Sequence, residues 1–376
     1  MDLERLKQKA LDNLPIGLFL FDRALRVCYF NRAFERIFSP SCPDSVGRAV
    51  DCVHAREGKC CGESQACSLC KLRALLLSCA ESGETRTEKI SQSVGETSKT
   101  LTFRATASPI GEGDFVCMLE DISDVQGRMD LAVSETRQFA RDLEKAQDIQ
   151  SRLLPSPMDV FSLCDFTYVY RQQYRVGGDF FDVYKIDDHT FGAYIADVSG
   201  AGVSGGLITV FLSDNLDKTT KSPAHALTRL NEKFRELDMG EESYITIFSM
   251  VFDKSMGTIR YCNGGHNQPA ILKRGNEIRT FECDGAPVCN WGIDFRYKDY
   301  ALQYRKGDKL VLYTDGVADI KNSEGEPFGQ ARIVESVRNA PDDMNLVLNR
   351  LAGDVKDFYG KEKVTDDITF LVLDLK

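Results

Sequence analysis

Apolar residues recur with different spacings in successive parts of the chain. In the first part, strands are predicted at 14–22, 26–30, 100–109 and 114–121, with a helix beginning at Asn31. From 122 to 154 the spacing changes to steps of three and four residues, which indicates one long helix. Short apolar runs separated by polar loops follow Pro155. We therefore expect an N-terminal domain at 1–123, a helical linker at 124–154 and a C-terminal domain at 155–376.

The predicted linker carries a narrow apolar stripe. It includes Met129, Val133, Leu143, Ala146 and Leu153, in a heptad-like pattern. Such a helix is not stable alone in water, so it needs a partner. We expect it to pair with its copy in a homodimer; the alternative is that it folds back onto a neighbouring domain.

The C-terminal part is richer in predicted strands than in helices. Strands are expected at 165–170, 179–186, 191–198, 244–252, 258–262, 269–273, 309–313 and 368–373. Helices are expected at 203–216, 224–237, 332–339 and 346–358. Since the helices fall into two separated groups, the pattern favours an α+β fold of packed sheets flanked by helices over a parallel βαβ repeat.

Acidic residues stand at the ends of these apolar runs. Asp179 follows two glycines, Asp197 ends the run 191–196, Asp315 follows the run 309–312, and Asp366 and Asp367 precede the last run. A single Asp-Gly pair usually marks a turn, but several carboxylates at strand ends indicate a site for Mg²⁺ or Mn²⁺. Two such ions can activate water for attack on phosphorus without a histidine or cysteine nucleophile.

The cysteines are unevenly distributed. Six of the 13 lie between Cys52 and Cys79. Cys67 and Cys70 have the spacing with which two thiolates reach one ion, and Cys61 with either Cys52 or His54 would complete a zinc or iron–sulfur site. The alternatives are that these cysteines are small buried residues or redox-active thiols without metal.

Composition restricts the class of protein. The 376 residues are 43% hydrophobic and 28% charged, as in folded globular proteins. A net charge of −10 argues against a nucleic-acid binder. The longest early apolar run, 16–21, is too short to insert into a membrane, and we expect a cytoplasmic protein. The chain has no P-loop, and a nucleotide cyclase would need a nucleotide pocket that the sequence does not reveal.

The order of elements in the first 124 residues resembles a PAS sensor domain. The resemblance is carried by Leu14-Pro-Ile-Gly17, Asn31-Arg-Ala-Phe34 and Leu119-Glu-Asp-Ile-Ser123. The cysteine-rich segment 52–79 lies inside this PAS-like domain.

Six ordered motifs in the rest of the chain resemble the SpoIIE/RsbU branch of the PPM phosphatases, bacterial relatives of protein phosphatase 2C. They are Leu153-Leu-Pro155, Val176-Gly-Gly-Asp-Phe-Phe-Asp182, Ala196-Asp-Val-Ser-Gly200, Asn263-Gly-Gly-His-Asn267, Leu312-Tyr-Thr-Asp-Gly316 and Asp366-Asp-Ile-Thr369. The resemblance implies an α-β-β-α sandwich with two Mn²⁺ or Mg²⁺ ions that hydrolyses phosphoserine or phosphothreonine on proteins. One departure is Ala201, where these proteins commonly carry histidine.

The same resemblance implies roles for individual residues. Asp197 would bridge both metals, and Asp315 and Asp366 would complete one site. The Val198 carbonyl would help hold the other, with Asp179 as a direct or water-mediated ligand. Asp367 is a further candidate, although adjacent strand residues face opposite ways.

We therefore interpret the chain as a signalling phosphatase in which a PAS-like sensor acts through a dimeric helix on a metal-dependent catalytic domain. By resemblance, its substrate is a phosphorylated anti-sigma-factor antagonist of the STAS type in a partner-switching pathway. The alternatives are a non-catalytic scaffold and a redox or metal sensor that acts by binding a partner.

Overall fold

The structure is a computed structural model that describes residues 3–38, 40, 44–57, 61–95, 99–111, 113–281, 283–292 and 295–376. The chain divides into two compact units, Met1–Gln138 and Phe139–Lys376. Residues 58–60 of the cysteine-rich segment lie outside the described residues.

The described part of the N-terminal unit contains one five-stranded antiparallel sheet with helices inserted between its second and third strands. The strands are β1 (Gly17–Asp22), β2 (Val27–Phe30), β3 (Arg86–Val94), β4 (Lys99–Pro109) and β5 (Asp114–Asp121), in the order β2-β1-β5-β4-β3. The helices are α1 (Leu3–Asp12), α2 (Arg32–Phe38), α3 (Val46–Ala49), α4 (Val53–Glu57), η1 (Gln65–Leu69) and α5 (Lys71–Ser82). The predicted strands and the helix after Asn31 are confirmed.

Asn31 explains why α2 starts where it does. Its Oδ1 accepts hydrogen bonds from the backbone N–H of Phe34 (3.0 Å) and of Leu18 (2.9 Å), so it caps the helix and ties it to β1. Strand β3 was missed from the sequence, because most of its side chains are polar and exposed. Such an edge strand lacks the apolar alternation on which strand prediction depends.

The linker is helical, as predicted. Helix α6 spans Ser123–Arg152 and crosses the boundary between the two units. Its apolar side chains are largely exposed: Met129 by 61%, Phe139 by 62% and Ile149 by 59%. Among the described residues of α6, Gln150 alone is buried.

The C-terminal unit contains two antiparallel sheets in its described residues. The first runs β14 (Tyr300–Gln303), β10 (Thr258–Gly264), β9 (Tyr244–Asp253), β8 (Thr190–Val198), β7 (Asp179–Lys185), with β13 (Val288–Cys289) paired to β9. The second runs β12 (Glu277–Thr280), β11 (Ile271–Arg274), β15 (Lys309–Tyr313), β16 (Ile368–Leu375), β6 (Cys164–Arg171). The helices are α7 (Pro157–Val160), α8 (Val203–Asn215), α9 (Pro223–Glu236), α10 (Asp315–Ala318), α11 (Gly329–Asn339) and α12 (Met344–Tyr359).

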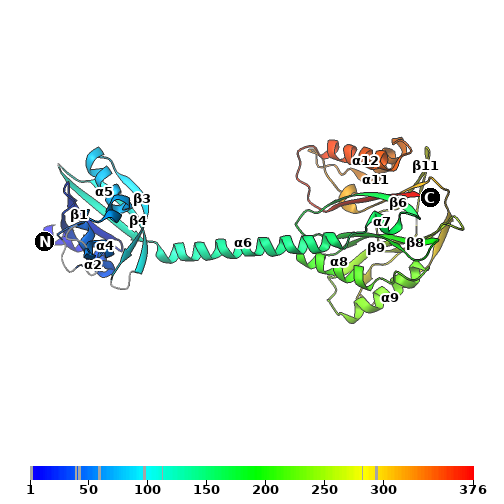
Figure 1. Cartoon of the computed structure of the whole chain (residues 1–376), viewed down its shortest axis with the longest axis horizontal. Helices are drawn as coiled ribbons and strands as arrows, with labels where there is room; N and C mark the ends of the chain where they lie inside the picture. Colours follow the sequence, from blue (N-terminus) through cyan, green and yellow to red (C-terminus); the bar gives the residue numbers. More distant parts are fainter. Residues whose placement is uncertain are drawn as a thin grey trace. The chain divides into compact units, whose positions relative to one another are not determined.

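Three apolar clusters hold the C-terminal unit together. One joins the facing sides of the two sheets, with Phe181 and Phe248 from the first sheet against Leu312 and Leu371 from the second. Another packs α8 and α9 on the first sheet, and a third packs α11 and α12 on the second. Figure 1 shows the two helix pairs on opposite sides of this unit. The observed mixture of sheets and helices agrees with the predicted α+β class.

No helix among the described residues is long and apolar enough to cross a membrane.

Candidate active site

The predicted acidic residues come from both sheets of the C-terminal unit. Asp179 begins β7 and lies opposite Asp197 on β8. Asp315 begins α10, directly after β15, and Asp366 lies two residues before β16. Because β15 and β16 pair with each other, the second sheet delivers Asp315 and Asp366 from neighbouring strands.

A hydroxyl group links the acidic residues of the two sheets. Thr314, next to Asp315, donates from its Oγ1 to a carboxylate oxygen of Asp179 (2.7 Å), and its backbone N–H donates to the carbonyl of Thr369 (3.1 Å). Thr314 is fully buried. This contact therefore fixes Asp179 relative to the turn that carries Asp315.

The carboxylates interact electrostatically. Burial, followed by the charges of Asp315, Asp366 and Asp367, raises the pKa of Asp197 to about 7. Burial and the charge of Asp197 raise the pKa of Asp179 well above its ordinary value. Carboxylates crowded in this way resist ionisation, and a bound divalent cation would relieve the repulsion.

The donor chemistry fits a hard divalent cation, because carboxylate and carbonyl oxygens surround the site. A side chain at Gly178 would place its Cβ 2.8 Å from the Val198 carbonyl oxygen, so only glycine leaves that oxygen accessible from this side. Nevertheless, within the described part of the chain no three His, Cys, Asp or Glu side chains are placed to hold a metal ion by themselves. Backbone carbonyls and water would have to complete any coordination shell.

Asp367 makes contacts different from those of the other acidic residues. Its two oxygens accept backbone N–H groups of Gln173 (2.7 Å), Gly178 (2.8 Å) and Asp179 (3.3 Å). Its carboxylate therefore holds the loop that leads into β7. Asp366, by contrast, is exposed, and partial desolvation raises its pKa.

The Asn263–Asn267 motif connects both sheets close to the carboxylates. His266 is 3% exposed; its Nε2 lies 3.0 Å from the Tyr313 carbonyl and its Nδ1 lies 3.4 Å from Thr246 Oγ1. Thr246 Oγ1 donates to the Asp197 carbonyl (3.1 Å). Since a carbonyl only accepts, Nε2 carries the proton. Burial lowers the pKa of His266 to about 4, which keeps the ring neutral.

Gln150 brings the end of the linker helix into contact with the same loop. Its Nε2 donates to the Gly177 carbonyl (2.9 Å) and to Thr209 Oγ1 on α8 (2.8 Å), and its Oε1 accepts the Gly177 N–H (3.3 Å). Sequence reasoning missed the roles of Gln150, Thr246 and Thr314. The one available signal was Gln150 itself, a polar residue in register with the apolar stripe.

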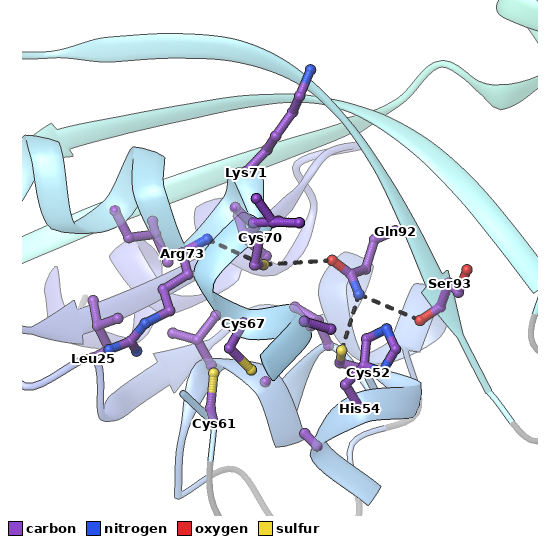
Figure 2. Close-up of a pocket in the computed structure, with 18 of the residues that line it drawn as sticks. Leu25, Cys52, His54, Cys61, Cys67, Cys70, Lys71, Arg73, Gln92 and Ser93 are labelled. Atoms are coloured by element: carbon purple, nitrogen blue, oxygen red, sulfur yellow. Dashed lines mark hydrogen bonds between the residues drawn. The ribbon is translucent and has the colours of Figure 1, made fainter. Parts of the chain in front are cut away.

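The predicted sensor residues also lie together, in the N-terminal unit. Cys52, His54, Cys61, Cys67 and Cys70 line one cavity of about 610 Å³ (Figure 2). As in the catalytic unit, no three metal-binding side chains among the described residues meet around one ion position there.

Comparison with known proteins identifies both units. The family model described as "Stage II sporulation protein E (SpoIIE)" matches residues 187–376, and a PAS domain model matches residues 4–66. Phosphoserine phosphatase RsbP of Bacillus subtilis is 26% identical over 246 residues, which cover 63% of this chain and 58% of RsbP. Phosphoserine phosphatase RsbU of the same organism is 25% identical over 245 residues, covering 63% of this chain and 71% of RsbU.

Known structures share the fold. The SiaA-PP2C domain of Pseudomonas aeruginosa superimposes with a TM-score of 0.59 at 18% identity, covering 64% of this chain and 99% of that domain. A SpoIIE fragment from Bacillus subtilis, with its PP2C phosphatase domain and part of its regulatory domain, gives a TM-score of 0.50 at 14% identity and covers 78% of this chain and 80% of the fragment. Because the SpoIIE model covers half of the sequence, the chain belongs to the SpoIIE family, whose phosphatase fold it joins to an N-terminal PAS domain.

Proposed function

We propose that this protein is a metal-dependent protein serine/threonine phosphatase. The proposal rests on three observations: Asp179 lies opposite Asp197 on one sheet, Asp315 and Asp366 come from neighbouring strands of the other, and the charges of Asp315 and Asp366 act on Asp197. The similarity to two phosphoserine phosphatases supports the reaction class. The division into a sensor at 1–123, a linker at 124–154 and a sandwich phosphatase domain at 155–376 is part of the proposal.

Asp179, Asp197, Asp315, Asp366 and the Val198 carbonyl would hold two Mn²⁺ or Mg²⁺ ions. When bound, such ions supply a water of lowered pKa for attack on phosphorus and neutralise charge on the phosphoryl oxygens. The protein's own residues fix the geometry: Thr314 orients Asp179, and Thr246 with His266 connects the backbones at Asp197 and Tyr313. We assign Asp367 a supporting role through the loop before β7, and regard direct ligation by it as the weaker interpretation.

Regulation would pass through α6. Its exposed apolar residues suit pairing with a second copy, which would make the protein a homodimer. Gln150 couples the end of this helix to Gly177, two residues before Asp179. A rotation of paired helices would therefore move the loop that presents Asp179, a two-state change of the kind that coupling requires.

The proposed substrate is a phosphorylated anti-sigma-factor antagonist of the STAS type. The test is to incubate the full-length protein with such phosphoproteins and Mn²⁺ and to follow release of phosphate, with EDTA as control. Release that EDTA abolishes would support the assignment. Turnover of another phosphoserine protein without release from any STAS protein would contradict the substrate class, and no turnover on any substrate would favour a non-catalytic scaffold.

A further inference from the structure

The cavity of the N-terminal unit is lined by thiols from three separate segments. Cys52 precedes α4, Cys61 lies in the turn before η1, and Cys67 lies within η1 with Cys70 directly after it. Apolar side chains of α3 and α5 line it as well, together with basic and polar residues of α5 and β3, and none of the residues described there is an aspartate or glutamate. A cavity without carboxylates does not suit a hard cation, whereas thiols suit soft metals.

Hydrogen-bond donors point at these sulfur atoms. Gln92 Nε2 donates to Cys52 Sγ (3.0 Å), and the backbone N–H of Arg73 donates to Cys70 Sγ (3.5 Å) at the start of α5 (Figure 2). The side chain of Arg73 also lines the cavity. Donors of this kind stabilise thiolates that ligate a metal centre.

The spacing of the thiols argues against a single ion. The amide of Gln92 stands between two of them: its Nε2 donates to Cys52 Sγ, and its Oε1 accepts from the Cys70 thiol at 4.0 Å. Two thiolates on one tetrahedral zinc lie only about 4 Å apart, because each Zn–S bond is about 2.3 Å long. A single ion or a metal cluster has to displace this amide, and the wider cluster then requires less movement of the thiols towards one another. A volume of about 610 Å³ also greatly exceeds what one ion fills.

We propose that this cavity binds an iron–sulfur cluster through the thiolates of Cys52, Cys61, Cys67 and Cys70. A cluster is wider than a single ion and therefore suits thiols that line a cavity without meeting at one point. A cluster held by four thiolates carries a net negative charge. The cavity wall suits this charge, because it offers the side chain and the backbone N–H of Arg73 and, among its described residues, no carboxylate. Binding displaces one proton from each thiol.

The proposal also connects the cavity to the linker. Strand β3 contributes Gln92 and Lys89 to the cavity wall, and the Lys89 ammonium donates to the side-chain carbonyl of Gln126 on α6. A cluster that displaces Gln92 would therefore act on a strand that contacts the first turns of α6. The binding step does not depend on the proposed phosphatase activity.

The experiment is anaerobic reconstitution of the full-length protein with Fe³⁺, sulfide and a thiol reductant, followed by desalting. Iron and acid-labile sulfide per chain and the visible sulfur-to-iron absorption are measured for the wild type, Cys67→Ser and Cys70→Ser. Cys28→Ser is the matched control, because Cys28 is exposed and lies outside the cavity. Wild type and Cys28→Ser should retain equal iron and sulfide with the visible band, and both cavity variants should lose them.

Two further arms keep the test decisive. In the wild type, reconstitution should protect Cys67 and Cys70 from alkylation by iodoacetamide, which needs no variant and so does not depend on variant folding. Separately, the protein is titrated with Co²⁺ as a substitute for zinc. Failure to retain iron, or equal alkylation with and without reconstitution, would overturn the proposal. If the protein forms no cluster but shows tetrahedral Co²⁺–thiolate absorption, the cavity holds a single metal ion and not a cluster.

Discussion

At the scale of single residues, Asp197 shows how burial changes the protonation of the candidate active site. The pKa of Asp197 is raised to about 7, first by burial and then by three neighbouring carboxylates. In metal-free protein the folded state therefore keeps a proton on Asp197 between about pH 4 and pH 7, where the unfolded chain has lost it. Because the folded state binds more protons there, its stability should fall as the pH rises through this window.

Asp197→Asn removes this titration. In EDTA, we compare the melting temperature of the variant with that of the wild type at each pH. The difference should shift in favour of the variant by roughly 2–8 °C as the pH is raised from about 5 to about 7.5. Thermal melts at several pH values measure this difference. A difference that is constant across the range would show that Asp197 is not held protonated.

The carboxylate of Asp367 accepts hydrogen bonds from three backbone N–H groups at the start of β7 and in the loop before it. Asp367→Ala would leave those donors buried without an acceptor, which should cost roughly 1–3 kcal/mol of stability. Urea unfolding of the full-length protein measures the loss in the transition of the catalytic unit. The control is Asp343→Ala, which removes one helix cap at the start of α12 and should cost about 1 kcal/mol. A loss in Asp367→Ala smaller than that in Asp343→Ala would argue against the loop-holding role.

At the scale of elements, sequence pattern was sufficient where apolar periodicity was strong. The central strands and the long helices of the C-terminal unit were predicted from their apolar runs. Strands β12 and β14 were not, since most of their residues are exposed or only half-buried, and β13 was not, since it has only two residues. The four strand-end aspartates were found as candidates, but the contact of Thr314 with Asp179 joins residues 135 positions apart and leaves no local signal.

The contact between α6 and the loop before β7 yields a further prediction. Gln150→Ala removes the hydrogen bonds to Gly177 and Thr209, so the segment that presents Asp179 loses a support. The Mn²⁺ concentration for half-maximal activity should rise by roughly 3–10-fold, equivalent to about 1 kcal/mol. A manganese titration of phosphatase activity measures it.

Thr209→Val is the matched control for this prediction. It removes the contact with α8 and leaves the Gly177 contacts in place. It should therefore change the manganese requirement less than Gln150→Ala does. Equal changes, or none, would contradict coupling through the loop.

At the scale of the whole molecule, the exposed apolar residues of α6 predict self-association. Met129→Glu together with Phe139→Glu places charges among side chains that are 61% and 62% exposed in the single chain. Sedimentation velocity should show a dimer for the wild type and a monomer for this double variant. Arg141→Glu, a change at an exposed polar position of α6, should leave the dimer intact. A monomeric wild type would contradict regulation through a paired helix.

The central claim is that carboxylates from two sheets form one metal-dependent phosphatase site. The most direct test is hydrolysis of para-nitrophenyl phosphate and of a phosphoserine protein, with Mn²⁺ or EDTA, by wild type, Asp197→Asn, Asp315→Asn and the surface control Asp357→Asn. We predict turnover that requires Mn²⁺, is unchanged in Asp357→Asn and falls roughly 100-fold or more in the other two variants. Turnover that survives EDTA, or that persists in Asp197→Asn and Asp315→Asn, would contradict the account.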